Sequence, residues 1–152
     1  MAKVAILLGS KSDLKYWEES KKYMDYFMID ADLEILSAHR TPEKVAKFSK
    51  EARGNGCQVI IAGAGMAAHL AGAVAAHTDL PVLGVPLPGG VMDGLDALLS
   101  TVQMPAGVPV ATFAVGNAGF RNACVFCAQI LSLQDTEIKS RLEVFREQGS
   151  KL

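Results

Sequence analysis

The sequence lacks the features that mark several large classes of protein. It has only three cysteines in 152 residues, too few for a disulfide framework. No apolar run approaches the roughly 20 residues of a membrane-spanning helix, and the first run, residues 4–8, is too short for a signal segment. A formal charge of −1 provides no basic surface for nucleic acid. We therefore expect a cytoplasmic protein that binds neither membrane nor nucleic acid.

The composition that remains is typical of a globular α/β protein. Half of the residues are hydrophobic, a fifth are charged, and fourteen are glycine. A chain of this length can bury a core without disulfides or metals. We predict one domain over residues 1–152, in which residues from about 136 form a C-terminal helical tail. The sequence does not decide whether that tail packs on a neighbouring chain or on its own surface.

The chain is organised around residues 59–86, which predict a βαβ unit. Residues 59–61 are a β-branched run that fits a strand buried on both faces. Gly63-Ala64-Gly65 predicts a turn after this strand, followed by a helix over residues 66–76 and a second strand at 82–85. Such a crossover connects parallel strands. The rest of the chain is expected to pack on this unit.

Similar alternation continues on both sides of the central unit. We predict further strands at residues 4–8, 32–36 and 110–115, and the mixed composition of 32–36 places that strand nearer an edge. The predicted helices cover residues 14–27, 42–53, 93–101, about 120–133 after a turn at 116–119, and 136–148, with Ser12 or Asp13 capping the first and Thr41 the second. The pattern predicts a five-stranded, parallel, doubly wound sheet of flavodoxin-like order.

Polar residues gather directly after the first three strands. The first strand is followed by Gly9-Ser10-Lys11-Ser12-Asp13, the second by Ser37-Ala38-His39-Arg40, and the third by Gly63-Ala64-Gly65. In doubly wound sheets, ligands bind beyond the carboxyl ends of the strands. The three segments are therefore expected to form one ligand site.

Each of these side chains also has a structural interpretation. Arg40 is suited to a phosphate group, yet it could equally form a surface ion pair with Glu43 or Asp13. His39 could act as a general acid and base or could be a solvated residue. Ser10 and Ser12 could be turn and cap residues, and the Asp13 carboxylate could accept hydrogen bonds from a ribose. The composition alone leaves these alternatives open.

Two familiar motifs are incomplete or misplaced. A dinucleotide fingerprint would need a third glycine where Ala68 stands, and the acidic residue expected after the next strand is missing. Cys124 and Cys127 have CxxC spacing, but they lie inside a predicted apolar helix, which favours an inert packed pair. The three histidines do not have the spacing of a metal site, and His77 falls at the far end of its helix.

Five motifs occur in the order found in a known family. The sequence resembles the PurE family, the 5-(carboxyamino)imidazole ribonucleotide mutases of bacterial purine synthesis, along nearly its whole length. SAHRTP and the AGAG–AAHL stretch are the most specific of the motifs. The motifs are GSKSD at 9–13, SAHRTP at 37–42, AGAGMAAHLAG at 62–72, LPVLGVP at 80–86 and VQMPAGVPVATFAVG at 102–116.

The resemblance implies a three-layer, flavodoxin-like sandwich that assembles as a homo-octamer and uses no cofactor or metal. It implies a carboxylate transfer from the exocyclic amine of an aminoimidazole ribonucleotide to a ring carbon. His39 would be the catalytic proton shuttle and Arg40 a phosphate ligand. The remaining implied substrate-binding residues are Ser10, Ser12, Asp13, Ser37, Ala64, Gly65 and His69.

Two alternatives remain beside the mutase. A related branch of the family carboxylates aminoimidazole ribonucleotide with free carbon dioxide, and it typically has lysine after the SAH histidine, where this chain has Arg40. A dinucleotide-binding α/β module is the more distant alternative.

The chain also departs from the common pattern of the PurE family at two positions. These are Leu14, where tryptophan is frequent, and Met66, where a third glycine is common.

Overall fold

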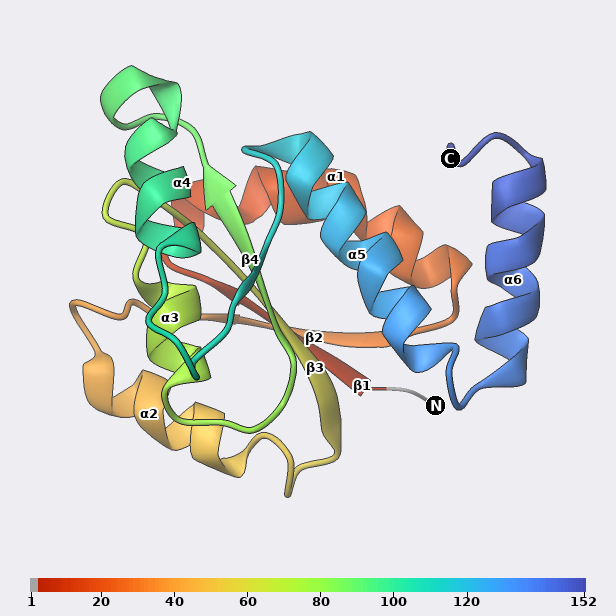
Figure 1. The fold of residues 1–152 in the computed structure, drawn as a ribbon, viewed down its shortest axis with the longest axis horizontal. Helices are drawn as coiled ribbons and strands as arrows, with labels where there is room; N and C mark the ends of the chain where they lie inside the picture. Colours follow the sequence, from red (N-terminus) through yellow and green to blue (C-terminus); the bar gives the residue numbers. More distant parts are fainter. Residues whose placement is uncertain (1–2) are drawn as a thin grey trace.

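Five parallel strands form one sheet with helices on both faces (Figure 1). The computed structural model describes residues 3–152. The strand order is β2-β1-β3-β4-β5, and every neighbouring pair is parallel, which is the predicted flavodoxin-like doubly wound topology. The predicted edge position of the second strand is confirmed. The strands are β1 (Lys3–Leu8), β2 (Asp30–Ile35), β3 (Cys57–Gly65), β4 (Val82–Leu87) and β5 (Ala111–Thr112).

The helices form two layers that enclose the sheet. Helices α2, α3 and α4 cover one face, whereas α1 and α5 cover the other and α6 lies beyond α5 (Figure 1). None of the helices in residues 3–152 is long and apolar enough to cross a membrane. The helices are α1 (Leu14–Tyr26), α2 (Pro42–Glu51), α3 (Leu70–Ala75), α4 (Leu95–Val102), α5 (Asn117–Leu131) and α6 (Thr136–Glu147), with 3-10 turns η1 (Lys11–Asp13) and η2 (Val91–Asp93).

Strand β1 shows why the sheet is central. Successive side chains of a strand point to opposite faces. Val4 and Ile6 join the core between the sheet and α1/α5, whereas Ala5 and Leu7 join the core under α2 and α3. All four are buried, so both faces of the strand are covered. This double burial explains why a continuous apolar run predicts an interior parallel strand.

The end of β3 differs from the prediction. Residues 63–65 do not form a turn, because they continue the strand and pair with β4 as far as Leu87. Position 63 has little room for a side chain, because a Cβ there would lie 3.0 Å from Phe120 and 3.2 Å from Leu8. The chain instead turns at Met66, whose φ is +56°. Consequently α3 begins only at Leu70 and is shorter than the predicted helix over residues 66–76.

Other boundaries are also shorter or displaced. Strand β5 has two residues instead of the predicted six, because beyond it only isolated hydrogen bonds remain, such as that from Phe113 N to Gly84 O at 3.0 Å. Asp13 occupies the predicted N-cap position of α1, but its side chain makes no capping hydrogen bond. Ser10 caps the preceding 3-10 turn, because its hydroxyl accepts from the backbone N–H of Ser12. Thr41 occupies the N-cap position of α2, but its side chain makes no capping hydrogen bond.

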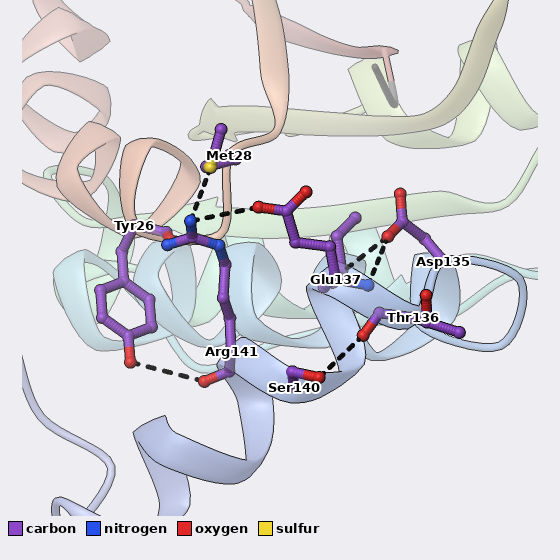
Figure 2. A network of polar contacts seen from close by, with 8 residues as sticks. Tyr26, Met28, Asp135, Thr136, Glu137, Ser140 and Arg141 are labelled. Atoms are coloured by element: carbon purple, nitrogen blue, oxygen red, sulfur yellow. Dashed lines mark hydrogen bonds and ion pairs between the residues drawn. The ribbon is translucent and has the colours of Figure 1, made fainter.

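The C-terminal helix α6 packs on its own chain. Its apolar side chains Ile138, Leu142 and Phe145 are buried in the core that also contains residues of α1 and α5. Figure 2 shows the polar contacts beside this core, where Arg141 Nη1 donates to the carbonyl of Tyr26 at 3.0 Å and the Tyr26 hydroxyl approaches the carbonyl of Arg141. Residues 136–147 are therefore part of the packed structure and not a loose tail.

Candidate functional site

A cavity of about 600 Å³ opens at the carboxyl ends of β1, β2 and β3. These strands are neighbours in the sheet, so the loops that follow them converge on one rim. All nine residues expected to form the site line this cavity. They are Ser10, Ser12, Asp13, Ser37, His39, Arg40, Ala64, Gly65 and His69.

The loop after β1 is held by local hydrogen bonds and by β3. The hydroxyl of Ser10 accepts a hydrogen bond from the backbone N–H of Ser12 at 3.3 Å and one from the Ser12 hydroxyl at 3.0 Å. The backbone N–H of Gly9 donates to the carbonyl of Gly63 at 3.1 Å. The two serines thus fill a structural role within the turn while they also line the cavity.

Asp13 is the acidic side chain on the cavity wall. Its partial burial raises the pKa of the carboxyl above the ordinary value of 3.8, although the backbone of Ser10 and the charge of Lys15 act in the opposite direction. Burial disfavours the charged form of a carboxyl because the ion loses hydration. A ligand that donates hydrogen bonds to Asp13 would replace part of that lost hydration.

The loop after β2 is shaped by Ser37. Its hydroxyl accepts a hydrogen bond from the backbone N–H of Arg40 at 3.1 Å, and its carbonyl accepts one from the Thr41 hydroxyl at 3.0 Å. Within residues 3–152, Arg40 forms no ion pair within 4 Å with either Glu43 or Asp13. The guanidinium therefore remains available to an anion in the cavity.

Two histidine side chains are in contact at the cavity wall. The Nε2 atom of His39, after β2, lies 2.8 Å from the Nδ1 atom of His69, which precedes α3. The ring planes are perpendicular and their centroids are 5.1 Å apart. The distance is that of a hydrogen bond, so one of the two nitrogens carries the proton and the other accepts it.

The end of β3 brings backbone close to the cavity. Ala64 and Gly65 are half-buried there, and a Cβ on residue 65 would lie 3.3 Å from the carbonyl of Leu87. Met66 follows with a left-handed backbone conformation and a side chain that is 67% exposed. Small residues therefore leave backbone groups uncovered along this part of the wall.

The sequence-based reasoning missed several lining residues. Pro88 and Gly89 follow β4 and also line the cavity. The same signal that identified the other loops, a position just after a parallel strand, could have identified them. Met66 and Ala67 also line the cavity, although the predicted helix over residues 66–76 includes them.

The motifs set aside earlier lie away from the cavity. Cys124 and Cys127 are fully buried and form no disulfide. Burial raises the pKa of the Cys124 thiol to about 12 and that of Cys127 well above its usual value, so both are protonated at neutral pH. The ring of His77 contacts the carbonyl of Ala73 at 2.9 Å, at the other end of α3. Within residues 3–152, no cluster of three His, Cys, Asp or Glu side chains could hold a metal ion.

A doubly wound sheet with a polar cavity over three adjacent strand ends is the architecture of an α/β protein that binds a small molecule. The chain belongs to the AIR carboxylase family, whose model matches residues 3–151. It is 49% identical, over 97% of its length and 92% of the relative's, to the N5-carboxyaminoimidazole ribonucleotide mutase of Saccharolobus solfataricus. The enzyme of that name from Escherichia coli K12 is 48% identical over 96% of this chain and 86% of its own.

A solved structure agrees with these sequence relationships. The crystal structure of Treponema denticola PurE superposes with a TM-score of 0.88 at 29% identity, covering 99% of this chain and 92% of that chain. The crystal structure of a variant of the Treponema protein gives the same values. The predicted membership of the PurE family is therefore confirmed.

Proposed function

We propose that this chain is an N5-carboxyaminoimidazole ribonucleotide mutase of purine biosynthesis. The enzyme moves the carboxylate of 5-carboxyaminoimidazole ribonucleotide from the exocyclic amine to ring carbon 4. The relatives at 48–49% identity that cover nearly the whole chain carry this name. The observation that carries the proposal within the structure is the convergence of nine family-motif residues on one cavity.

The cavity offers separate partners for the parts of a ribonucleotide. We assign the phosphate to Arg40, because its guanidinium is free of carboxylate partners within the described chain and can form charge-assisted hydrogen bonds. The turn of Ser10, Ser12 and Asp13, which offers two hydroxyls and a carboxylate, is assigned to the ribose. Ser37 shapes the loop that presents Arg40. The aminoimidazole is then directed towards the two histidines and the end of β3.

The reaction needs one proton carrier that is used twice. The C–N bond to the carboxylate breaks and releases carbon dioxide, and the amine nitrogen takes a proton from His39. Ring carbon 4 then attacks the carbon dioxide, and the proton left on that carbon returns to His39. The overall reaction therefore neither consumes nor releases a proton. A histidine suits this task because it exchanges protons near neutral pH.

The carbon dioxide must stay beside the ring between these two steps. We assign it to the wall formed by Ala64 and Gly65, where small residues let backbone amides approach a small ligand. Holding the two reactants together replaces a bimolecular encounter by an intramolecular step, which is a large catalytic advantage. His69 lies on the same side of the cavity, beside His39.

The alternative activity is carboxylation of aminoimidazole ribonucleotide by free carbon dioxide, the reaction after which the family is named. The test supplies substrate with a ¹³C-labelled carboxylate in the presence of excess unlabelled bicarbonate. A mutase transfers the label into the product carboxylate without dilution. Product that carries mainly unlabelled carboxylate would favour the carboxylase, and binding of NADH without binding of imidazole ribonucleotides would favour a dinucleotide module.

The finer features of the proposal are an octameric assembly and a cytoplasmic location. Support for assembly comes from an apolar strip along η2 and α4, because such a strip on the surface is typical of a protein interface. Size-exclusion chromatography coupled to light scattering would measure the mass of the assembly. We expect eight times the chain mass of 16.1 kDa. A monomeric mass would contradict the octamer. The exposed side chains of the strip are Val91, Met92, Leu95, Leu99 and Val102.

A further inference from the structure

One residue of the cavity wall has a backbone conformation that suits glycine better. Met66 has a φ of +56° and a side chain that is 67% exposed. A glycine would adopt this conformation without the cost that a Cβ brings. Such strained residues gather at functional sites, where the surrounding structure holds them. Within residues 3–152, Met66 is the one residue that combines a positive φ, a side chain and a place on the cavity wall; the others with a side chain and a positive φ are Met28, Met92, Asp93 and Ser150.

The backbone of Met66 is fixed on both sides. Gly65, directly before it, is paired with Leu87 of β4. Directly after it, the carbonyl of Met66 accepts a hydrogen bond from the backbone N–H of Ala68 at 2.9 Å. A methionine side chain has three rotatable bonds and a polarizable thioether. The side chain can therefore adapt to a ligand while its Cα stays in place.

The cavity has few apolar side chains larger than alanine. Among its lining residues these are Met66, Leu70 and Pro88. Leu70 is 2% exposed and belongs to the core under α2 and α3, and Pro88 is a rigid ring. Met66 is therefore the long and movable apolar group at the cavity. It directly follows the small residues Ala64 and Gly65, to which we assigned the carbon dioxide.

The carbon dioxide of the proposed reaction is difficult to hold. The molecule is small and carries no net charge, so an ion pair cannot retain it between the two chemical steps. It is transferred only if ring carbon 4 captures it faster than it escapes to the solvent. An apolar side chain that closes over the wall slows this escape, and dispersion contacts with a thioether suit an uncharged ligand.

We propose that Met66 is a specificity-determining residue whose thioether side chain covers the carbon dioxide on the wall of Ala64 and Gly65 and prevents its exchange with the solvent. The inference rests on the proposed function and assigns to one side chain the choice between the bound carboxylate and free carbon dioxide. Met66 forms no covalent bond in the reaction. It changes only the fraction of carbon dioxide that is lost after the C–N bond breaks, and each loss leaves aminoimidazole ribonucleotide behind.

The test uses two substitutions at position 66 and one control. Met66→Ala removes the thioether but keeps the Cβ, whereas Met66→Leu keeps an apolar side chain of similar size. Met28→Ala is the matched control, because Met28 also has a positive φ, is 46% exposed and does not line the cavity. All three variants keep a Cβ at a left-handed position, so backbone strain does not distinguish them. Since both methionines are exposed, no substitution opens a cavity in the core.

The first readout is the source of the product carboxylate. Each protein receives substrate with a ¹³C-labelled carboxylate in excess unlabelled bicarbonate, at amounts that give equal rates of conversion, and a sample without protein corrects for exchange in solution. Mass spectrometry should show that Met66→Ala raises the unlabelled fraction of the product by about threefold to tenfold. Met66→Leu and Met28→Ala should match the unaltered protein. Because the labelled fraction is set within each active site, a variant that is partly unfolded does not change it.

The second readout is the release of aminoimidazole ribonucleotide without bicarbonate, measured by chromatography. We expect more of it from Met66→Ala than from the other three proteins. Equal retention of the label by Met66→Ala and the unaltered protein would overturn the inference and leave the mutase in place. Equal losses in Met66→Leu and Met66→Ala would also overturn it, because an apolar cover would then have no effect. Dilution of the label by the unaltered protein would overturn the proposed function and the inference together.

Discussion

The two helical layers of the molecule are built from different residues. The layer of α1, α5 and α6 contains large aromatic side chains, and their rings meet at centroid distances between 5.1 and 6.1 Å. The layer of α2 and α3 is packed with small and aliphatic residues such as Ala71, Val74 and Val45. On the face covered by α2, α3 and α4, helix α4 leaves its apolar strip exposed. The aromatic residues are Trp17, Tyr23, Tyr26, Phe27, Phe120 and Phe145.

Loops that lead into both helical layers line the cavity. The loop after β1 leads into α1 of the aromatic layer and supplies Ser10, Ser12 and Asp13. The loops after β2 and β3 lead into α2 and α3, and they supply the histidine pair and Arg40. In our proposal, the loop of the aromatic layer holds the ribose, while the loops of the small-residue layer bind phosphate and move the proton.

The largest effect is expected from opening the aromatic layer. Phe120 is fully buried, packs 6.1 Å from the ring of Trp17 and fills the space that Gly63 leaves on β3. Phe120→Ala should lower the free energy of unfolding by about 3–5 kcal/mol, measured by urea denaturation. Phe126→Ala is the control, because Phe126 lies on the same helix and is 40% exposed. Equal losses in both variants would contradict the central position of Phe120.

The next effect concerns the loops of the small-residue layer. Arg40→Ala should weaken substrate binding by about 1.5–3 kcal/mol, because a charge-assisted hydrogen bond to phosphate is lost. Calorimetric titration with the product would measure the change. Arg53→Ala is the control, since Arg53 pairs with Asp79 at 2.8 Å and does not line the cavity. An unchanged affinity in Arg40→Ala would place the phosphate elsewhere.

The turn at the end of β3 is expected to show a smaller effect on stability. Met66 has a positive φ, which disfavours any residue with a Cβ. Met66→Gly should therefore be more stable to unfolding than Met66→Ala by about 1 kcal/mol, after the greater freedom of glycine in the unfolded chain is subtracted. Ala67→Gly, at the next residue and without a positive φ, should instead lose stability. If glycine were less stable than alanine at position 66 as well as at position 67, the turn at Met66 would not be strained.

The smallest effect is expected at Asp13, in the loop of the aromatic layer. The raised pKa means that the folded protein binds a proton at this carboxyl more tightly than the unfolded chain does. The charged form is therefore a cost to folding above that pKa, and the cost disappears as pH falls below the ordinary value of 3.8. Asp13→Asn should be slightly more stable than the unaltered protein at pH 7, and urea denaturation should show that the difference shrinks towards pH 4.

The same variant should lose substrate affinity, because a neutral amide with a single acceptor oxygen replaces the charged carboxylate assigned to the ribose. Asp25→Asn is a suitable control for charge, since Asp25 pairs with Lys21 on the surface of α1. A stability difference for Asp13→Asn that grows as the pH is lowered would contradict the sign derived from the pKa.

Much of the fold follows from local sequence. The apolar run of β1 and the Thr-Pro-Glu start of α2 placed these elements to within one or two residues. The region after β3 could not be placed in the same way, because glycine and alanine fit a strand, a turn and a helix. The segment is a strand because it pairs with β4 as far as Leu87, and Phe120 and Leu8, which lie far away in sequence, leave little room for a side chain at position 63. The chain then turns at residue 66, although this residue is a methionine and not a glycine.

The candidate site was more accessible to sequence reasoning than these boundaries. Residues that follow parallel strands must meet at one edge, so the convergence of residues 10, 39 and 65 could be expected from topology alone. The contact between the rings of His39 and His69 could not be expected, because it depends on how two loops bend towards each other. The same holds for Thr41, whose hydroxyl contacts Ser37 instead of capping α2.

The central claim is that the imidazole of His39 carries the proton in a carboxylate transfer. The most direct measurement incubates the unaltered protein and His39→Asn with 5-carboxyaminoimidazole ribonucleotide, without ATP or added metal, and follows the ring-carboxylated product by absorbance. We expect product from the unaltered protein only, while calorimetry shows that His39→Asn still binds the ribonucleotide. Full turnover by His39→Asn would contradict the claim.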